Sequence, residues 1–383
     1  MRREEVRMEQ EPIRLVQFTR SFHIGGTEVQ VLELLRGLPH HYRLQVSVLE
    51  DAGPLMGAVW KLGHVAETFP LKGSVAQANT AYQVYRLARW FRVNRVELVH
   101  VHDFYSTLLA VPAAKLAGVK VIVGRLDLSH WQGKARRAVH ARLTAMADHV
   151  VANAEAIRRL LVEEEGLPAS KVSVIHNGLD LARFEARMSE GLKAPLPDTG
   201  GAPVVVHVAN MNHPVKRQED LLLALAILHH GGTPLHAYLV GDGPRRKSLE
   251  KLAAELGVSD TVHFLRHRTD VAAIYARATL GVLCSSAEGM SNAIMEGMAA
   301  GLPMVVTRVG GNTDLVRDGE RGLVVPPERP AQLAQAFSQL LANPENARRM
   351  GRAARDFVAR ELSLERLVRL HDALYQKVAR GVG

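Results

Sequence analysis

The sequence predicts an α/β protein with two parallel-sheet domains, and three observations support this fold class. Short β-branched runs alternate with amphipathic helical patterns along most of the chain, which is typical of βαβ units. The 383 residues are too many for one ordinary domain. The composition is 47% hydrophobic but only 5% aromatic, which suits the packing of aliphatic helices on sheets better than an all-β protein.

The first domain is predicted over residues 13–185. Its expected strands are the runs 13–19, 44–50, 97–102, 119–124, 148–153 and 171–177. Helical patterns fill most of the intervals, for example at 28–38 and 81–91. Residues 186–202 then lose this periodicity and contain several prolines and glycines, so we expect a linker there.

The second domain is predicted over residues 203–362. Its expected strands are the runs 203–210, 235–242, 261–265, 278–286, 303–307 and 322–325. Helical periodicity dominates from about Pro330 to the end of the sequence. Ligands of open parallel sheets bind beyond the carboxyl ends of the strands, so we expect the ligand site in the cleft between the two domains.

Charge and cysteine content indicate the compartment and the kind of ligand. The formal net charge of +9 is spread along the chain and favours anionic ligands or surfaces. The single cysteine, Cys284, excludes an intramolecular disulfide and suits a reducing compartment. Residues 1–12 form a charged tail without the apolar core of a signal peptide, and the longest aliphatic run, 221–228, is too short for a membrane span. These features predict a soluble, cytoplasmic protein.

The most informative stretch is CSSAEGMSNAIMEGMAAGLPMVVTRVGGNTD, residues 284–314. Glu288 follows the carboxyl end of a predicted strand, and Glu296 lies on the next predicted helix, for which Ser291 or Asn292 is the candidate cap. Such a helix start binds phosphate, and Gly289 lets a ligand approach the backbone. The two carboxylates suit hydroxyl groups on either side of a diphosphate, which is the pattern of a nucleotide sugar. Two glutamates on an ordinary surface helix are the alternative.

This stretch also carries a resemblance to a known family. The run EGMSNAIME, residues 288–296, resembles the E-x7-E motif of retaining glycosyltransferases with the GT-B fold, and most closely that of the large family four. Four further stretches resemble the family in the expected order, at 24–38, 147–184, 215–228 and 239–264. The resemblance covers roughly residues 13–375. It implies two Rossmann-like domains facing a cleft, with a final helix, residues 363–383, that crosses back onto the first domain.

The resemblance also implies roles for individual residues in holding a nucleotide diphosphate sugar. Glu288 contacts the donor sugar, Glu296 holds the ribose, and Lys216 neutralises the diphosphate as the glycosidic bond breaks. Backbone N–H groups lie near the sugar and phosphates at Gly289, Met290, Ser291 and Asn292. Gly25 and Gly26 bring the amino-terminal helix start against the same phosphates from across the cleft. Enzymes of this kind need no bound metal or other cofactor, and the sequence contains no convincing metal cluster.

One departure from the family pattern concerns the phosphate clamp. The family usually has an arginine six positions before the lysine, where this chain has Asn210. Asparagine offers hydrogen bonds without charge, and Arg217 and Arg266 are the candidate substitutes. Residues 265–267 lie where the resemblance places recognition of the base, so the sequence does not identify the nucleotide.

Polar residues of the first domain are candidates for contact with the acceptor or the donor sugar. His100, His102 and Asp103 cluster at the end of one predicted strand, and Asp127 and His130 stand at the end of another. A structural cluster is the alternative in both cases. A basic stretch, residues 134–142, follows Trp131. This stretch is either a solvated helix face or a contact surface for an anionic membrane or a lipid-linked acceptor.

The sequence therefore predicts an enzyme of cell-envelope or polysaccharide biosynthesis. It transfers a sugar, with retention of anomeric configuration, to a saccharide, lipid-linked or small-molecule acceptor bound by residues 1–185. No nucleic acid partner is expected, and contact with the membrane is peripheral. A nucleotide-sugar epimerase and a non-catalytic sugar-nucleotide-binding protein are the alternatives. A nicotinamide dehydrogenase is less favoured, because GDGP, residues 241–244, lacks the full G-x-G-x-x-G fingerprint.

Overall fold

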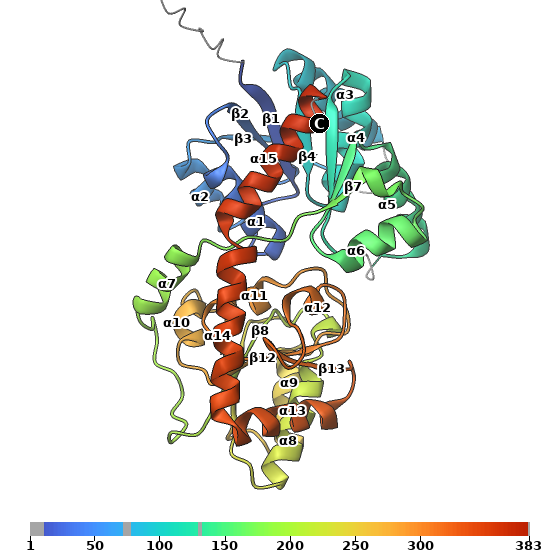
Figure 1. Ribbon diagram of the computed structural model, residues 1–383. Coiled ribbons are helices and arrows are strands. Elements are labelled where there is room, and N and C mark those ends of the chain that lie inside the picture. Colours follow the sequence, from blue (N-terminus) through green and yellow to red (C-terminus); the bar gives the residue numbers. More distant parts are fainter. Residues whose placement is uncertain (1–10, 72–77, 129–131, 382–383) are drawn as a thin grey trace, which may run out of the picture.

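The first domain contains a seven-stranded, fully parallel sheet with the order β3-β2-β1-β4-β5-β6-β7 (Figure 1). The computed structural model describes residues 11–71, 78–128 and 132–381. The strands are β1 (Ile13–Thr19), β2 (Tyr42–Val48), β3 (Ala66–Thr68), β4 (Leu98–Val101), β5 (Lys120–Arg125), β6 (His149–Ala152) and β7 (Val172–Val174). All six strands expected from the sequence are present. The additional strand, β3, has only three residues and no apolar run that would indicate it.

Helices cover both faces of this sheet. They are α1 (Gly26–Gly37), α2 (Met56–Lys61), α3 (Ala78–Val93), α4 (Phe104–Ala117), α5 (Lys134–Met146) and α6 (Glu155–Arg159), which continues as a π-helical turn (Leu160–Glu164). Helix α4 begins directly after β4, because the Asp103 carboxylate accepts hydrogen bonds from the backbone N–H groups of Tyr105 and Ser106 at 2.8 and 3.0 Å.

The second domain contains a six-stranded parallel sheet with the order β10-β9-β8-β11-β12-β13. Its strands are β8 (Val204–Val208), β9 (His236–Val240), β10 (Val262–Arg266), β11 (Leu280–Leu283), β12 (Met304–Thr307) and β13 (Gly322–Val325). Its helices are α8 (Gln218–His230), α9 (Arg246–Glu255), α10 (Val271–Tyr275), α11 (Asn292–Ala299), α12 (Asn312–Leu315) and α13 (Pro330–Ala342). All six expected strands are present here too.

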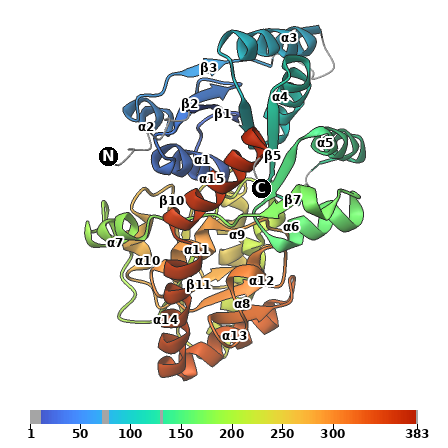
Figure 2. The ribbon, with the colours of Figure 1, turned by 45° about the horizontal axis from the view of Figure 1, so that its top comes forward.

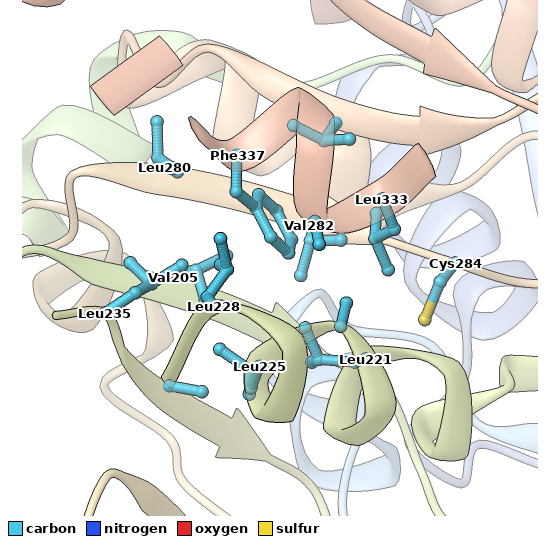
Figure 3. Close-up of a cluster of buried hydrophobic side chains, with 14 of the residues drawn as sticks. Val205, Leu221, Leu225, Leu228, Leu235, Leu280, Val282, Cys284, Leu333 and Phe337 are labelled. Atoms are coloured by element: carbon cyan, nitrogen blue, oxygen red, sulfur yellow. The ribbon is translucent and has the colours of Figure 1, made fainter. Parts of the chain in front are cut away.

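The main core of the second domain lies between this sheet and helices α8 and α13. Figure 3 shows Leu221, Leu225 and Leu228 of α8 beside Phe337 of α13, over the buried strand residue Val282. The aliphatic run 221–228, which is too short for a membrane span, is therefore the buried face of a core helix.

The chain ends by crossing from the second domain to the first, as Figures 1 and 2 show. Helix α14 (Pro344–Glu361) packs on the second domain, and α15 (Leu364–Arg380) packs on the first. Leu362 and Ser363 separate them, and Ser363 caps α15 by accepting a hydrogen bond from the Arg366 N–H at 3.2 Å. Tyr375 of α15 accepts a hydrogen bond from Gln17 of β1 at 3.1 Å. These contacts confirm the predicted crossing of the final helix.

One predicted segment differs from the structure. The expected linker, residues 186–202, begins inside helix α7 (Leu181–Ser189). Asp180 caps this helix by accepting a hydrogen bond from the Arg183 N–H at 2.9 Å, and the buried Phe184 anchors it to the second domain. The proline and glycine content of the segment does not reveal these two anchors. Irregular backbone occupies only the later part of the segment.

Candidate functional site

A cavity of about 870 Å³ lies between the two domains. In both sheets the strand order reverses beside the first strand of the domain, between β1 and β4 and between β8 and β11. The reversal leaves a crevice at the carboxyl ends of the strands, which is where ligands of such sheets bind. The first domain lines the cavity with Gly26, Thr27, Gln30, Leu126, Asp127, Asn153 and Asn177. The second domain lines it with Val208, Asn210 and residues 213–216 and 287–293.

An ion pair on the second-domain wall joins the two residues predicted to be catalytic. Lys216 ends a short 3-10 turn (Pro214–Lys216) after β8, and Glu288 follows β11. The Lys216 Nζ lies 2.6 Å from the Glu288 Oε1, which also accepts a hydrogen bond from the Ser285 hydroxyl at 2.5 Å. Their side chains are 22% and 10% exposed. The cavity therefore offers a cation whose partner is a carboxylate that an incoming anion can replace.

A histidine that the sequence analysis did not single out lies behind this pair. His207 of β8 is fully buried, and neither ring nitrogen has a hydrogen-bond partner among the described residues. Burial, together with the nearby charge of Lys216, lowers its pKa to about 4. The imidazole is therefore neutral and adds no second positive charge beside Lys216. In the sequence, His207 stands within an apolar strand run, and nothing there indicates a buried neutral imidazole behind Lys216.

The start of α11 faces the cavity. Of the two cap candidates, Ser291 is the N-cap, because its hydroxyl accepts a hydrogen bond from the Ile294 N–H at 3.4 Å. Asn292 instead bridges the domains: its Oδ1 accepts a hydrogen bond from the Asn177 side chain at 2.7 Å, and its Nδ2 donates to the Gly26 carbonyl at 3.3 Å. The starts of α1 and α11 thus lie against each other across the cleft, and residues of both helix starts line the same cavity.

The loop between β11 and α11 also contacts the first domain closely. A Cβ on Gly289 would lie 2.1 Å from the Leu126 carbonyl oxygen, so no larger residue fits without moving the domains apart. The Met290 sulfur accepts a hydrogen bond from the Asn177 N–H at 3.1 Å. We expected Gly289 to let a ligand approach the backbone. The structure shows that close contact with the first domain also requires a glycine at this position.

Four predicted donor-site residues lie outside the cavity lining. Burial raises the pKa of Glu296, on α11, to about 7. Arg217 has a positive φ, and its guanidinium pairs with the Asp220 carboxylate at 2.8 and 2.9 Å. Arg266 is exposed, also with a positive φ. Gly25 precedes α1, and a Cβ there would meet the Glu28 carboxylate. Asn210 is exposed and lines the cavity.

His100 lies within β4 and contacts the crossing helix α15, whereas His102, directly after β4, contacts β1. The His100 Nδ1 lies 2.7 Å from the Tyr375 hydroxyl, and the His102 Nε2 lies 2.7 Å from the Gln17 Oε1. Burial holds the pKa of both imidazoles well below the usual range. Asp103 caps α4. Asp127 lines the main cavity, as expected of a residue that contacts a substrate.

Some predictions fall on residues that the structure does not describe, among them His130, Trp131 and most of the charged tail. No group of three or more metal-binding side chains occurs within residues 11–71, 78–128 and 132–381. In the same part of the chain, no helix has the length and apolar character needed to cross a membrane.

Asn153 and Asn177 line the cavity but were missed by the sequence analysis. Asn153 follows β6, and its Oδ1 is buried without a partner among the described residues. Both asparagines lie in the matched stretch 147–184, as ANAE and HNGL. The sequence feature that could have indicated them is their position just after strand ends, where ligand-binding residues of parallel sheets lie.

Comparisons with known proteins support the division of the chain. Residues 24–183 match the family model described as Glycosyltransferase Family 4, and residues 202–343 match Glycosyl transferases group 1. D-inositol 3-phosphate glycosyltransferase of Nocardia farcinica is 32% identical over 69% of this chain and 56% of that protein. N-acetyl-alpha-D-glucosaminyl L-malate synthase of Bacillus anthracis is 29% identical over 56% of this chain and 55% of that protein. The matched region therefore spans little more than half of these two relatives.

Solved structures share the fold over nearly the whole chain. The Anabaena protein HepE, solved in complex with UDP, is 21% identical with a TM-score of 0.83, covering 95% of this chain and 100% of that chain. Sucrose-phosphate synthase from Thermosynechococcus elongatus is 19% identical with a TM-score of 0.78, covering 96% and 100%. These GT-B enzymes have the same two facing sheets. The two family matches correspond to the two sheets: the chain has a Glycosyltransferase Family 4 domain followed by a Glycosyl transferases group 1 domain.

Proposed function

We propose that this protein transfers a sugar from a nucleoside diphosphate sugar to a hydroxyl group of an acceptor, with retention of anomeric configuration. The observation that carries the proposal is the Lys216–Glu288 pair, at 2.6 Å, on a cavity wall that also contains the start of α11. A cation, a helix start and a carboxylate together suit the phosphates and the sugar of one donor. The two family matches and the names of the relatives support the reaction class.

In this proposal the donor diphosphate takes the place of the Glu288 carboxylate on the Lys216 ammonium. Negative charge grows on the phosphate as its bond to the anomeric carbon stretches, so the ammonium stabilises the transition state more than the bound donor. The N–H groups at the starts of α1 and α11 add to this effect from both sides of the cleft. Glu288, released from Lys216, is then available to the hydroxyl groups of the sugar.

In the proposed reaction every bond that forms is matched by a bond that breaks, and no further reactant is needed. The acceptor hydroxyl oxygen forms a bond to the anomeric carbon as the bond from that carbon to the phosphate oxygen breaks. The electron pair of the broken bond stays on the phosphate, and the hydroxyl proton moves to that phosphate oxygen on the same face of the sugar. The products are the glycoside and the nucleoside diphosphate. No metal or cofactor takes part in the proposed reaction.

The proposal is tested by donor binding and by turnover. Thermal shifts are measured with uridine, guanosine and adenosine diphosphate sugars, beginning with uridine because HepE was solved with UDP. Transfer predicts that nucleoside diphosphate release depends on an added acceptor. Release of an epimerised donor without acceptor supports the epimerase. Binding with no turnover under any acceptor supports the non-catalytic alternative.

We further propose peripheral contact with an anionic membrane through helix α5. Lys134, Arg136 and Arg137 are exposed on this helix, and Val139 beside them is 43% exposed. Basic and apolar side chains on one exposed helix suit a membrane surface. Sedimentation with vesicles of 30% phosphatidylserine, compared with pure phosphatidylcholine, tests the contact. Equal sedimentation with both would contradict it.

A further inference from the structure

A second cavity of about 230 Å³ lies on the first domain beside the main one. The two cavities share Thr27, Leu126 and Asp127 as lining residues, so they adjoin each other. The second cavity lies between the starts of α1 and α4 and the segment after β5, and no residue of the second domain lines it. A molecule in this cavity would reach the main cavity past Asp127.

Two buried polar side chains in the second cavity each keep one atom without a hydrogen-bond partner among the described residues. Gln132 and His140 are 4% and 5% exposed, and the Gln132 Nε2 lies 3.4 Å from the His140 Nδ1. The Gln132 Oε1 and the His140 Nε2 have no hydrogen-bond partner among the described residues. Buried polar groups are normally paired, so these two atoms indicate a missing ligand group.

The contact between these two side chains determines what they offer a ligand. If the amide nitrogen donates to Nδ1, the ring proton is on Nε2, which leaves one free donor and one free acceptor, the Gln132 Oε1. If the amide is turned over, Nδ1 donates to the amide oxygen, and the free groups are an N–H donor and the Nε2 lone pair. Either arrangement presents one donor and one acceptor, which matches a hydroxyl group.

The other polar residues of this cavity include more carboxyl groups than cations. Burial lowers the pKa of His140 and of His102 to about 3, so both rings are neutral. Three carboxyl groups, those of Glu28, Asp103 and Asp127, line the cavity; burial raises the pKa of the first two, and Asp103 also caps α4. The only cationic residue among the described lining residues is Arg20, and its guanidinium is shared with Glu50, 3.1 Å away. Carboxylates accept hydrogen bonds from hydroxyl groups and repel anions.

We propose that this cavity is the acceptor subsite and that it selects an uncharged polyhydroxyl group, such as a sugar ring or an inositol, over its phosphorylated form. The inference rests on the proposed function. It separates this chain from the two relatives described above, whose names contain a phosphate and a malate. The acceptor hydroxyl that lies beside Asp127 is then the one presented to the donor.

The charge preference is tested with matched pairs of acceptors. The pairs are myo-inositol with its 3-phosphate and N-acetylglucosamine with its 6-phosphate, using the nucleotide sugar that gives the largest thermal shift. We expect the unphosphorylated member of a pair to have at least about 100-fold higher kcat/KM, because like charges in an interface cost several kcal/mol. Preference for the phosphorylated member would overturn the proposal, as would the lack of both binding and transfer for every unphosphorylated sugar.

The subsite itself is tested with Gln132→Leu and a matched control, Gln45→Leu. Gln45 also has one weak amide contact, to Asn94 at 3.4 Å, and an unpartnered Oε1, but it does not line either cavity. We expect Gln132→Leu to raise the acceptor KM about 3- to 10-fold, with unchanged donor binding and no loss of thermal stability. The control should leave the acceptor KM unchanged. An unchanged KM in Gln132→Leu, or an equal rise in both variants, would overturn the subsite.

Failure of this inference is distinguishable from failure of the proposed function. If no nucleotide sugar raises the melting temperature of the unmodified protein, the proposed function itself is contradicted. A normal donor shift together with equal use of phosphorylated and plain acceptors contradicts only the subsite. Glu28→Gln should reduce the discrimination within each pair, because it removes one of the three carboxylates.

Discussion

The two walls of the cleft differ in how their charges are balanced. On the second domain, Lys216 and Glu288 neutralise each other at 2.6 Å, and the Ser285 hydroxyl supports the carboxylate. On the first domain, carboxylates outnumber cations, and Gln132 and His140 keep unpaired polar atoms. In the proposed function, Lys216 on the second-domain wall exchanges Glu288 for the ligand. The unpaired atoms of Gln132 and His140 on the first-domain side instead gain hydrogen-bond partners from the ligand. The second-domain wall therefore suits a charged leaving group, and the first-domain wall suits neutral hydroxyl groups.

The largest effect is expected from Lys216→Met on the second-domain wall. Removing one preorganised donor to a developing charge costs about 3–4 kcal/mol, so the rate should fall about 10²- to 10³-fold. The residue ends a short turn and is not part of a hydrophobic core, so the fold should be preserved. Glu288, whose side chain is 10% exposed, loses its ion-pair partner, so we also expect a loss of about 1–3 kcal/mol of stability. Steady-state kinetics and thermal melting measure both quantities.

Arg217→Met is the matched control for this prediction. Arg217 pairs with Asp220, which is 3% exposed, so its loss leaves a buried carboxylate unpaired. We expect this neighbouring variant to lose about 1–3 kcal/mol of stability while keeping most of its activity. If Arg217→Met lost activity and Lys216→Met did not, the two roles would have been exchanged.

The next effect concerns the contact that holds the two walls together. In Gly289→Ala the new methyl group would lie 2.1 Å from the Leu126 carbonyl oxygen, so the domains must separate slightly. We expect a loss of about 1–3 kcal/mol, which corresponds to about 5- to 160-fold in kcat/KM. Gly57→Ala is the control, since no atom lies within 4 Å of a Cβ at that helical position. Equal activities in the two variants would show that the contact is unimportant.

A smaller effect is expected from the pH dependence of stability. The pKa of Glu296 is raised from 4.5 to about 7 by burial, so the folded protein binds a proton that the unfolded chain releases. Its contribution to stability is present below about pH 4.5 and is lost as the pH rises through about 7. The melting temperature of Glu296→Gln, relative to the unmodified protein, should therefore increase over this range. A constant difference would contradict the raised pKa.

The smallest expected effect is that of a chelator. Because the proposed reaction uses Lys216 and backbone N–H groups for the phosphates, EDTA should leave the transfer rate nearly unchanged. Complete loss of transfer in EDTA, with recovery on addition of magnesium or manganese, would show that the phosphate site has been misassigned.

The same comparison of the two walls explains what the sequence could predict. Glu288, Ser291 and Asn292 lie within one strand–turn–helix segment, so their spacing predicted their common wall. Lys216 required the family resemblance, because it lies in a separate turn. The two amides of the cleft, Asn153 and Asn177, were missed because nothing local distinguishes them from other residues after strands.

The first-domain wall was less predictable because its residues come from distant segments. His102 and Asp103 were expected to face a ligand, and both line the second cavity, but their hydrogen bonds are made within the first domain. Gln132 precedes α5 and His140 lies on that helix, and the sequence analysis placed His140 only within a basic stretch. The two arginines proposed to replace the missing family arginine, Arg217 and Arg266, lie outside the cavity lining, and both have a left-handed backbone conformation. Their positive φ values were invisible in the sequence.

The central claim is that the donor diphosphate replaces Glu288 as the partner of Lys216. A crystal structure with bound nucleoside diphosphate tests it most directly, through the distance from the Lys216 Nζ to the Glu288 Oε1. The account predicts that this distance increases from 2.6 Å to beyond hydrogen-bonding range, while the Nζ lies within about 3 Å of a phosphate oxygen. Phosphates bound elsewhere, with the 2.6 Å pair intact, would contradict it.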